Sequence, residues 1–502
     1  MTNLSFLSVR CFRKINDLLI ENWSLFQTFL QHDKCRQTLK IIFIGGLETK
    51  ESHRTVIKGF LHQPLKTSTL RPMRIICFSP RYYPAVGGAE SYVISLAERF
   101  AADGHTVTVI TTDAHDFQLF WQPEARRVSN SAATEHNGVQ IKRFPVRHLP
   151  LTPLSYHAWR RGLWYLSHLP FIPAGLIARI ARQTPRLPEL WDWVKNGEFG
   201  QPVDVVMGLN ICYEPMLWAG KYFADRLDVP FVAAPFTHLG AGATPASDPQ
   251  SKFYTMRHQV DIVNKADIAL MQTRSEKDFY ISKGGTAERI HTASAGINPE
   301  EYGDGDGNRW RADHAIPPER PIVAYIGTHD YDKGTTHTIE AAGQLWLQGV
   351  EFELVLAGTQ TAEFSNYFNS ISPHLAQRIH LLGRISNEEK QDLLAALDLF
   401  VMPSRIDSFG IVFLEAWLYG KPVIGSQAWG MADVIDDGED GLLVPFGQPS
   451  ELAQTIGRLL ADSDRRRKMG KHGKAKTLAQ HRWNQKYESV LEILSEVVSQ
   501  PA

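Results

Sequence analysis

Apolar residues come in short runs that alternate with amphipathic stretches from about residue 73 onward. Residues 74–79 (RIICFS) form the first run, a turn-rich segment leads into a helical pattern over residues 89–102, and residues 104–111 form a second run. Strand, turn, helix and strand in this order are typical of a βαβ unit with parallel strands and a right-handed crossover. The pattern therefore predicts that an α/β domain begins here.

The same alternation continues along the chain and restarts once. Between the two halves lies a stretch rich in Gly and Asp at residues 303–307, followed by Pro317 and Pro318; such composition is typical of a linker. The fold class that this predicts is α/β, with two tandem Rossmann-like, doubly wound parallel-sheet domains that face a common cleft. The further predicted strands are residues 203–207, 230–234 and 268–271 in the first half, and 322–327, 352–358, 379–382, 399–402, 422–425 and 441–444 in the second.

We accordingly divide the chain into four parts. Residues 1–72 lack the α/β pattern and are interpreted as an N-terminal extension, to which we assign no function. The first domain is predicted over residues 73–300, with an insertion at 147–195, and the second over residues 318–480. The helical pattern of residues 481–502 is expected to cross back to the first domain.

Two carboxylates occupy unusual positions near a predicted helix at residues 410–418. Glu415 lies on the apolar stripe of this helix, and a carboxylate facing a core costs several kcal/mol unless it is hydrogen-bonded. Either a buried protein donor or a ligand diol must meet it, and we favour the ligand. Asp407 precedes the helix, where it could cap the first turn or lie beside a ligand that binds the exposed amides.

Three further motifs follow predicted strands, on the side where open α/β sheets bind ligands. Gly87 and Gly88 have amides that could receive an anion or a sugar hydroxyl, although they lack the spacing of a dinucleotide fingerprint. Lys333 could place a point charge on a phosphate. His238 follows the strand at residues 230–234. For each motif a purely structural role remains open: a tight turn, an exposed lysine or a core histidine.

Composition excludes several classes of partner. The 53 Lys and Arg residues almost cancel the 54 Asp and Glu residues, so no nucleic-acid partner is expected. The four cysteines, Cys11, Cys35, Cys77 and Cys212, are far apart and form no paired motif, so neither a disulfide framework nor a zinc site is predicted. No apolar run reaches the roughly 20 residues that span a bilayer, and a cytoplasmic location is expected.

Four motifs occur in an order that matches a known family: residues 83–90 (YPAVGGAE), 333–334 (KG), 383–386 (GRIS) and, above all, 403–424. Over about residues 73–495 the chain resembles the retaining, nucleotide-sugar-dependent glycosyltransferases of family 4, which have the GT-B fold. The resemblance implies transfer of a hexose from a nucleotide-sugar to a saccharide or lipid-linked acceptor. It also implies that no metal or other cofactor is needed, because Lys333, loop amides and helix ends offset the charge of the leaving diphosphate.

The resemblance further assigns roles to individual residues. Glu415 would hold the ribose diol, Lys333 would contact the diphosphate, and Asp407 with the amides after it would contact the transferred sugar. His238 would lie near the sugar, and residues 383–386 near the base. The implied set comprises Asp407, Glu415, His238 and Lys333 as catalytic residues, and Gly87, Gly88, Arg384, Ile385, Ser408, Phe409, Gly410 and Ile411 as substrate-binding residues.

Two departures from the family pattern affect this assignment. Asp407 stands where the family usually has glutamate, and Thr328 stands where it usually has an arginine that clamps the diphosphate. Arg384 or Arg405 could compensate for the missing guanidinium. Two alternatives therefore stay open: an epimerase or phosphorylase on the same fold, and a non-catalytic relative that binds a sugar nucleotide or a membrane.

The insertion has a composition of its own. Residues 147–186 contain six arginines, several aromatic residues and no acid. Such a mixture suits an anionic membrane surface or a lipid-linked acceptor, which would place the protein peripherally at the inner membrane face. The alternative is an insertion that packs over the first domain or forms a lid on the acceptor side.

Overall fold

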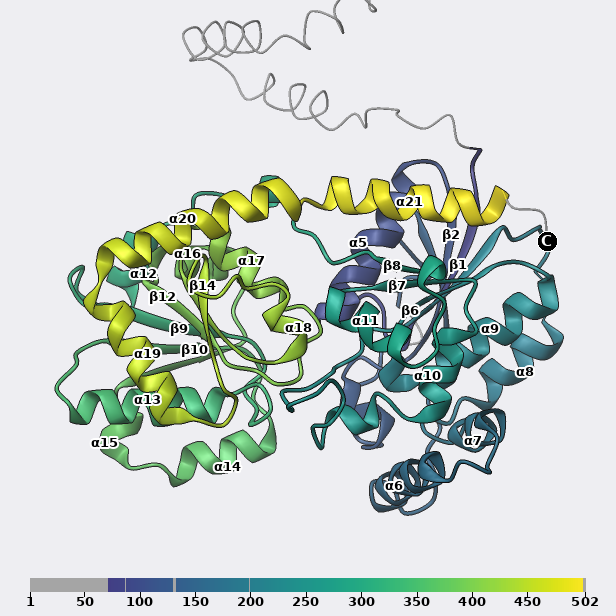
Figure 1. Ribbon diagram of the computed structural model, residues 1–502, viewed down its shortest axis with the longest axis horizontal. Coiled ribbons are helices and arrows are strands. Elements are labelled where there is room, and N and C mark those ends of the chain that lie inside the picture. Colours follow the sequence, from purple (N-terminus) through teal and green to yellow (C-terminus); the bar gives the residue numbers. More distant parts are fainter. Residues whose placement is uncertain (1–70, 86, 130–131, 198, 500–502) are drawn as a thin grey trace, which may run out of the picture. The chain divides into compact units, whose positions relative to one another are not determined.

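The computed structural model describes residues 71–499, except residues 86, 130, 131 and 198 (Figure 1). The described residues belong to one compact unit built on two open sheets. Up to residue 70, the predicted N-terminal extension lies outside the described residues. Among the described helices, none is both long and apolar enough to cross a membrane.

The first sheet has eight strands in the order β3-β4-β2-β1-β5-β6-β7-β8, and all neighbouring strands are parallel except β3 and β4. Its strands are β1 (Arg74–Phe78), β2 (Thr106–Thr112), β3 (Glu135–His136), β4 (Val139–Phe144), β5 (Val205–Leu209), β6 (Phe231–Ala234), β7 (Ile268–Met271) and β8 (Ile290–Thr292). Its helices are α5 (Gly88–Ala102), α6 (Leu154–His168), α7 (Ala174–Ala181), α8 (Pro188–Asn196), α9 (Pro215–Leu227), α10 (Arg257–Asn264) and α11 (Arg274–Ser282).

The second sheet has six parallel strands in the order β11-β10-β9-β12-β13-β14. These are β9 (Ile322–Ile326), β10 (Glu353–Ala357), β11 (Ile379–Gly383), β12 (Leu399–Met402), β13 (Val423–Ser426) and β14 (Gly441–Val444). The helices around it are α12 (Gly307–Asp313), α13 (Thr335–Leu347), α14 (Ala362–Ser370), α15 (Pro373–Ala376), α16 (Asn387–Ala396), α17 (Ile411–Leu418), α18 (Trp429–Ala432), α19 (Pro449–Ala461) and α20 (Ser463–Gln480), and α21 (Trp483–Ser499) ends the described chain.

Strand β1 shows why these sheets are covered on both faces. Successive side chains of a strand point to opposite faces, so a strand that is apolar throughout must be buried on both. Ile75 and Cys77 pack in a core that includes residues of α5 and α21, whereas Ile76 and Phe78 pack in a second core with residues of α8 and α9. The continuous apolar runs of the sequence therefore correspond to central, doubly covered strands.

The strands predicted from the apolar runs are confirmed, with shifts of one or two residues at their ends. The predicted linker at residues 303–307 differs in part, because Gly307 already begins α12. The Asp306 carboxylate accepts a hydrogen bond from the Arg309 amide and caps this helix. An Asp beside glycines can thus start a helix as well as mark a linker.

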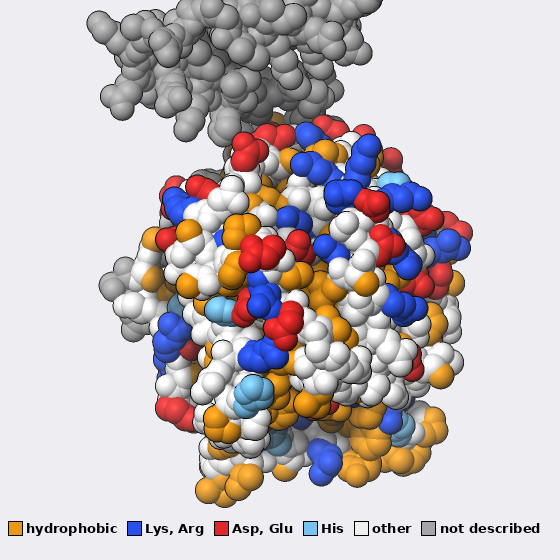
Figure 2. Space-filling model, turned by 90° about the vertical axis from the view of Figure 1, so that its left-hand side faces the viewer, with side chains coloured by type: hydrophobic (Ala, Val, Ile, Leu, Met, Phe, Trp, Pro, Cys, Tyr) orange, Lys and Arg blue, Asp and Glu red, His pale blue; other side chains and the backbone are white. Residues whose placement is uncertain are grey.

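Helix α21 lies along the first domain, as Figure 1 shows in yellow. Trp483 contacts the ring of Tyr92 at 5.4 Å between centroids, and Tyr487 donates a hydrogen bond of 2.7 Å to Asp103. The face of the second domain in Figure 2 carries interspersed acidic and basic side chains, which agrees with the near-zero net charge of the sequence.

Candidate functional site

A cavity of about 650 Å³ lies at the carboxyl ends of the strands of both sheets. In each sheet the strand order reverses next to the first strand, between β1 and β5 and between β9 and β12. The loops that follow the two strands at such a point run to opposite sides of the sheet and leave a crevice between them. Open α/β sheets bind ligands in this crevice. The loops after β9 and β12 supply Lys333 and Asp407, and the loops after β1 and β5 supply Arg81 and Asn210.

The structure brings ten of the twelve predicted site residues to this cavity. Glu415 and Ile385 are not among the residues that line it. The lining residues from the prediction are Gly87, Gly88, His238, Lys333, Arg384, Asp407, Ser408, Phe409, Gly410 and Ile411.

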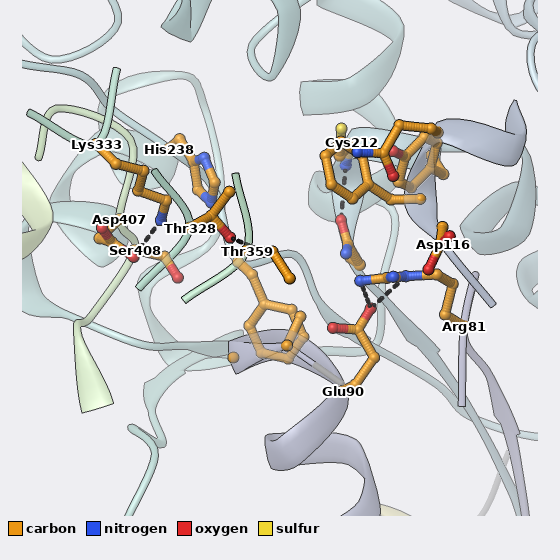
Figure 3. A pocket seen from close by; sticks show the side chains of 18 of the residues that line it. Arg81, Glu90, Asp116, Cys212, His238, Thr328, Lys333, Thr359, Asp407 and Ser408 are labelled. Atoms are coloured by element: carbon orange, nitrogen blue, oxygen red, sulfur yellow. Dashed lines mark hydrogen bonds and ion pairs between the residues drawn. The ribbon is translucent and has the colours of Figure 1, made fainter. Parts of the chain in front are cut away.

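Asp407 and Lys333 form an ion pair on one side of the cavity (Figure 3). Lys333 Nζ donates a hydrogen bond of 2.7 Å to Asp407 Oδ1, while Asp407 Oδ2 is buried without a protein hydrogen-bond partner. Burial opposes ionisation of this carboxyl, but the lysine outweighs burial and holds the pKa of Asp407 below its usual value. Asp407 does not cap α17, whose N-cap position is occupied by Gly410. An ionised oxygen that no protein group satisfies is thus available to a ligand.

Gly334 makes this pairing possible. Its φ of +78° is in the left-handed region, and a Cβ at this position would lie 2.4 Å from the Pro403 carbonyl oxygen. Only glycine fits such a turn and close approach without strain. The loop after β9 therefore packs directly on the loop after β12, which carries Lys333 to Asp407.

His238 faces the pair from the first domain (Figure 3). Its ring stacks on Tyr254 at 4.4 Å between centroids, and its Nδ1 is buried without a protein hydrogen-bond partner. Burial and the nearby Lys333 ammonium lower the pKa of His238 to about 4. At neutral pH the imidazole is therefore uncharged and can donate one hydrogen bond and accept another, as a sugar hydroxyl requires.

Glu415 has protein partners outside the cavity lining. The Tyr302 hydroxyl and Lys390 Nζ donate hydrogen bonds of 2.6 and 2.7 Å, both to Glu415 Oε1, and the residue is 8% exposed. Of the two possibilities that the sequence left open, the structure thus contains the buried protein donor. Neither bond reaches Glu415 Oε2, and the role of this carboxylate toward a ribose stays a prediction.

Two family profiles together match most of the chain. The profile described as "Glycosyl transferases group 1" matches residues 306–476, and the profile described as "Glycosyl transferase 4-like domain" matches residues 87–296. The chain belongs to the group 1 glycosyltransferases. The family resemblance inferred from the motifs is thereby confirmed.

The chain has 31% identity or less to the individual relatives compared with it. The α-D-kanosaminyltransferase of Streptomyces kanamyceticus is 31% identical over 231 residues, which are 45% of this chain and 58% of that enzyme. The chain thus spans little more than half the length of this relative. Sucrose-phosphate synthase from Thermosynechococcus elongatus matches with a TM-score of 0.64 at 22% identity, covering 85% of this chain and 99% of that one.

Anabaena HepE in complex with UDP-glucose matches with a TM-score of 0.61 at 18% identity, covering 84% of this chain and 100% of that one. Likeness at such low sequence identity is evidence for the fold alone. It confirms the predicted GT-B architecture of two parallel-sheet domains.

Thr328 lines the cavity where the family usually has arginine, and the structure separates the two arginines that could replace it. Arg405 is bound to Asp332, with Nη2 at 2.5 Å and Nε at 2.9 Å from Oδ1, and lies 3.5 Å from Asp248. Arg384 lines the cavity, is exposed and forms no ion pair with any described residue. Arg384 is therefore the guanidinium that remains available to a phosphate.

The sequence prediction missed a charged pair on the first-domain side of the cavity (Figure 3). Arg81 Nε donates a hydrogen bond of 3.0 Å to Glu90 Oε1, and both residues line the cavity. Gly87 leaves the space for this carboxylate, because a Cβ there would lie 2.2 Å from Glu90 Oε2. Glu90 belongs to the YPAVGGAE motif and could have been selected from it, whereas Arg81 gave no local signal.

The structure also bears on the expectations about metals and disulfides. Cys77 and Cys212 are free thiols, whereas Cys11 and Cys35 lie outside the described residues. Among the residues that the structure describes, no three His, Cys, Asp or Glu side chains are grouped so that they could hold a metal ion.

His329, next to Thr328, makes stability dependent on pH. Its ring is 0% exposed beside Phe364, neither ring nitrogen has a protein hydrogen-bond partner, and burial lowers its pKa from 6.5 to about 4. Because the unfolded chain takes up this proton first, the stability contribution is present above pH 6.5 and is lost as the pH falls toward 4. We expect His329→Leu to raise the free energy of unfolding by about 1–3 kcal/mol and to flatten its decline over this range.

Urea unfolding of both proteins at several pH values between 6.5 and 4 measures this difference. His374→Leu, at an exposed histidine of α15, is the control and should leave the pH dependence of the wild type unchanged. A His329→Leu protein with the same decline as the wild type would contradict the assignment.

Proposed function

We propose that the protein transfers a hexose from a nucleotide-sugar to a saccharide or lipid-linked acceptor, with retention at the anomeric carbon. The observation that carries this proposal is the buried Asp407 carboxylate, which is held by Lys333, keeps one oxygen unsatisfied and lies near the neutral His238 in the cavity lining. A carboxylate and a neutral imidazole suit the hydroxyls of a sugar, and the ammonium suits the diphosphate that leaves.

Support for a nucleotide-sugar donor comes from the lining and from the structural neighbours. Lys333 and Arg384 give the second domain two cations at the cavity, and the first-turn amides of α17 lie at the same place. Anabaena HepE, a structural neighbour, was solved with UDP and with UDP-glucose. In the proposed reaction the bond between the anomeric carbon and the diphosphate oxygen breaks, and the acceptor oxygen bonds to that carbon on the same face. The proton of the acceptor hydroxyl goes to the leaving donor phosphate.

The acceptor is proposed to bind on the first-domain side of the cavity. Arg81, Glu90, Asp116 and Asn210 line this side and offer both donors and acceptors of hydrogen bonds. The proposed reaction needs no divalent metal, because Lys333, Arg384 and the amides of α17 offset the charge on the leaving diphosphate.

Nucleotide release tests the proposed donor chemistry. The wild type is incubated with UDP-, GDP- and ADP-hexoses, and we expect release from at least one donor class, unchanged by EDTA. Glu415→Gln is expected to raise the donor KM about ten- to hundredfold, the equivalent of a charged hydrogen bond of about 1.5–3 kcal/mol. Glu389→Gln, a partly exposed neighbour of Lys390 on α16, is the matched control.

Three outcomes would count against the proposal. Equal KM values for wild type and Glu415→Gln would remove Glu415 from the donor site. Loss of release in EDTA would contradict the metal-free reaction. Release from no donor would overturn the assigned activity.

A non-catalytic relative is the second candidate function, and Thr328 is the observation that favours it. A diphosphate that leaves without the usual guanidinium loses a bidentate, permanently charged partner. Tight binding of a UDP-hexose in calorimetry without nucleotide release under any acceptor would support this candidate over the transferase.

A further inference from the structure

The insertion carries most of the exposed apolar side chains of the described residues. Seven of the eleven large hydrophobic residues that are exposed lie within residues 151–176, among them Leu151 (84%), Leu154 (77%), Tyr165 (59%) and Phe171 (77%). They belong to α6, α7 and the turns beside them, at the bottom of Figure 1. In Figure 2 hydrophobic side chains gather along the lower edge of the molecule, at the same height. Such a concentration marks an interaction surface.

The six arginines of the insertion separate into two groups of three. Arg160 is buried against Glu214 at 2.6 Å, Arg147 is paired with Glu189, and Arg182 stacks on Trp191. These three are already engaged by neighbouring acids or by a ring, so they are not available to a partner. The other three, Arg161, Arg179 and Arg186, are exposed and form no ion pair with any described residue.

A basic recess adjoins this surface. It is a cavity of about 570 Å³ whose lining includes Trp164 and His168 of α6 and the cations Lys252, Arg257 and Lys283. The guanidinium of Arg257 donates hydrogen bonds to the carbonyls of residues 167, 169 and 170 and to no carboxylate. The acid in the lining, Asp261, is engaged by Lys265 at 2.8 Å. The recess thus has a net positive charge and is large enough to hold a polar headgroup.

We propose that the surface formed by α6, α7 and this recess docks on an anionic phospholipid bilayer. Exposed Leu, Phe and Tyr side chains insert shallowly at the interface, while arginines and lysines around them meet lipid phosphates, with one headgroup in the recess. A second copy of this chain is disfavoured as the occupant, because a two-fold contact would oppose like charges on a surface whose residues 147–186 contain no acid.

The docked surface adjoins the first-domain side of the cavity. Tyr156 and His157 of α6 contact the ring of Trp121 at 6.0 and 6.4 Å between centroids, and the next residue, Gln122, lines the cavity. Bilayer docking is independent of the proposed transfer reaction, and the test of docking does not require the protein to be catalytically active.

Vesicle sedimentation of the full chain tests the proposal. We expect the wild type to bind vesicles of phosphatidylglycerol and phosphatidylcholine in equal parts and to dissociate from them at high salt. It should not bind vesicles of phosphatidylcholine alone. Phe171→Ser with Tyr165→Ser, and separately Arg161→Glu with Arg179→Glu, should each weaken binding at least tenfold.

Leu347→Ser and Lys468→Glu change an exposed leucine and an exposed lysine of the second domain, and both are expected to bind as the wild type does. Light scattering in solution examines the alternative occupant, because a dimer that Phe171→Ser dissociates would overturn the proposal. Two further results would overturn the proposal. One is binding to neutral vesicles that is as tight as binding to anionic ones, and the other is a loss of binding in the control variants equal to that in the test variants.

Discussion

Asp407→Asn is expected to lower kcat by about 10²- to 10³-fold while changing the donor KM by less than tenfold, because in the proposed reaction its fixed charge acts on the transferred sugar mainly in the transition state. The substitution keeps the shape of the side chain and removes the charge that Lys333 neutralises at 2.7 Å. Steady-state kinetics with the donor that gives release in the wild type measures the two constants separately.

Two further variants separate a role toward substrate from a purely structural role for Asp407. Asp407→Glu restores the residue that the family usually has and should retain activity within about tenfold of the wild type, because the charge remains. If Asp407 only held Lys333 in place, the double variant Asp407→Asn with Lys333→Met would be as active as Lys333→Met alone. That equality, or an unchanged kcat in Asp407→Asn, would refute the role toward the sugar.

Arg160→Met is expected to lower the free energy of unfolding by about 3–5 kcal/mol, because it leaves the carboxylate of Glu214 buried without its guanidinium partner. Arg160 Nη1 lies 2.6 Å from Glu214 Oε1, and the glutamate is 0% exposed. His258 Nε2 lies 3.0 Å from the same oxygen and Gln259 Nε2 donates to the other one, so the variant keeps these two contacts but loses the guanidinium. Urea unfolding followed by circular dichroism gives the difference.

The helix itself offers the control. Arg161→Met alters the next residue, which is exposed and has no ion-pair partner among the described residues, and should change stability by less than about 0.5 kcal/mol. Replacing both charges of the buried pair, by Arg160→Met with Glu214→Gln, should recover part of the lost stability. Equal losses of unfolding free energy in Arg160→Met and Arg161→Met would contradict the predicted contribution of the buried pair to stability.

Local patterns in the sequence determined the elements of this fold. Runs such as residues 399–402 are strands because an apolar run of that length can be satisfied only by burial on both faces, and turn residues mark where each run ends. Two tandem sheets, and a site in the loops after their strands, followed from the order of these elements alone. The family motifs then named ten of the residues that line the cavity.

Only the tertiary structure decided which charged groups pair. Lys333 and Asp407 are 74 residues apart, Arg160 and Glu214 are 54 apart, and neither pairing leaves a trace in local periodicity. The same holds for Glu415, whose donors come from a loop and from α16, and for the six arginines of the insertion, three of which are already engaged. Burial is encoded residue by residue, whereas the partner of a charge depends on how sheets and loops stack in space.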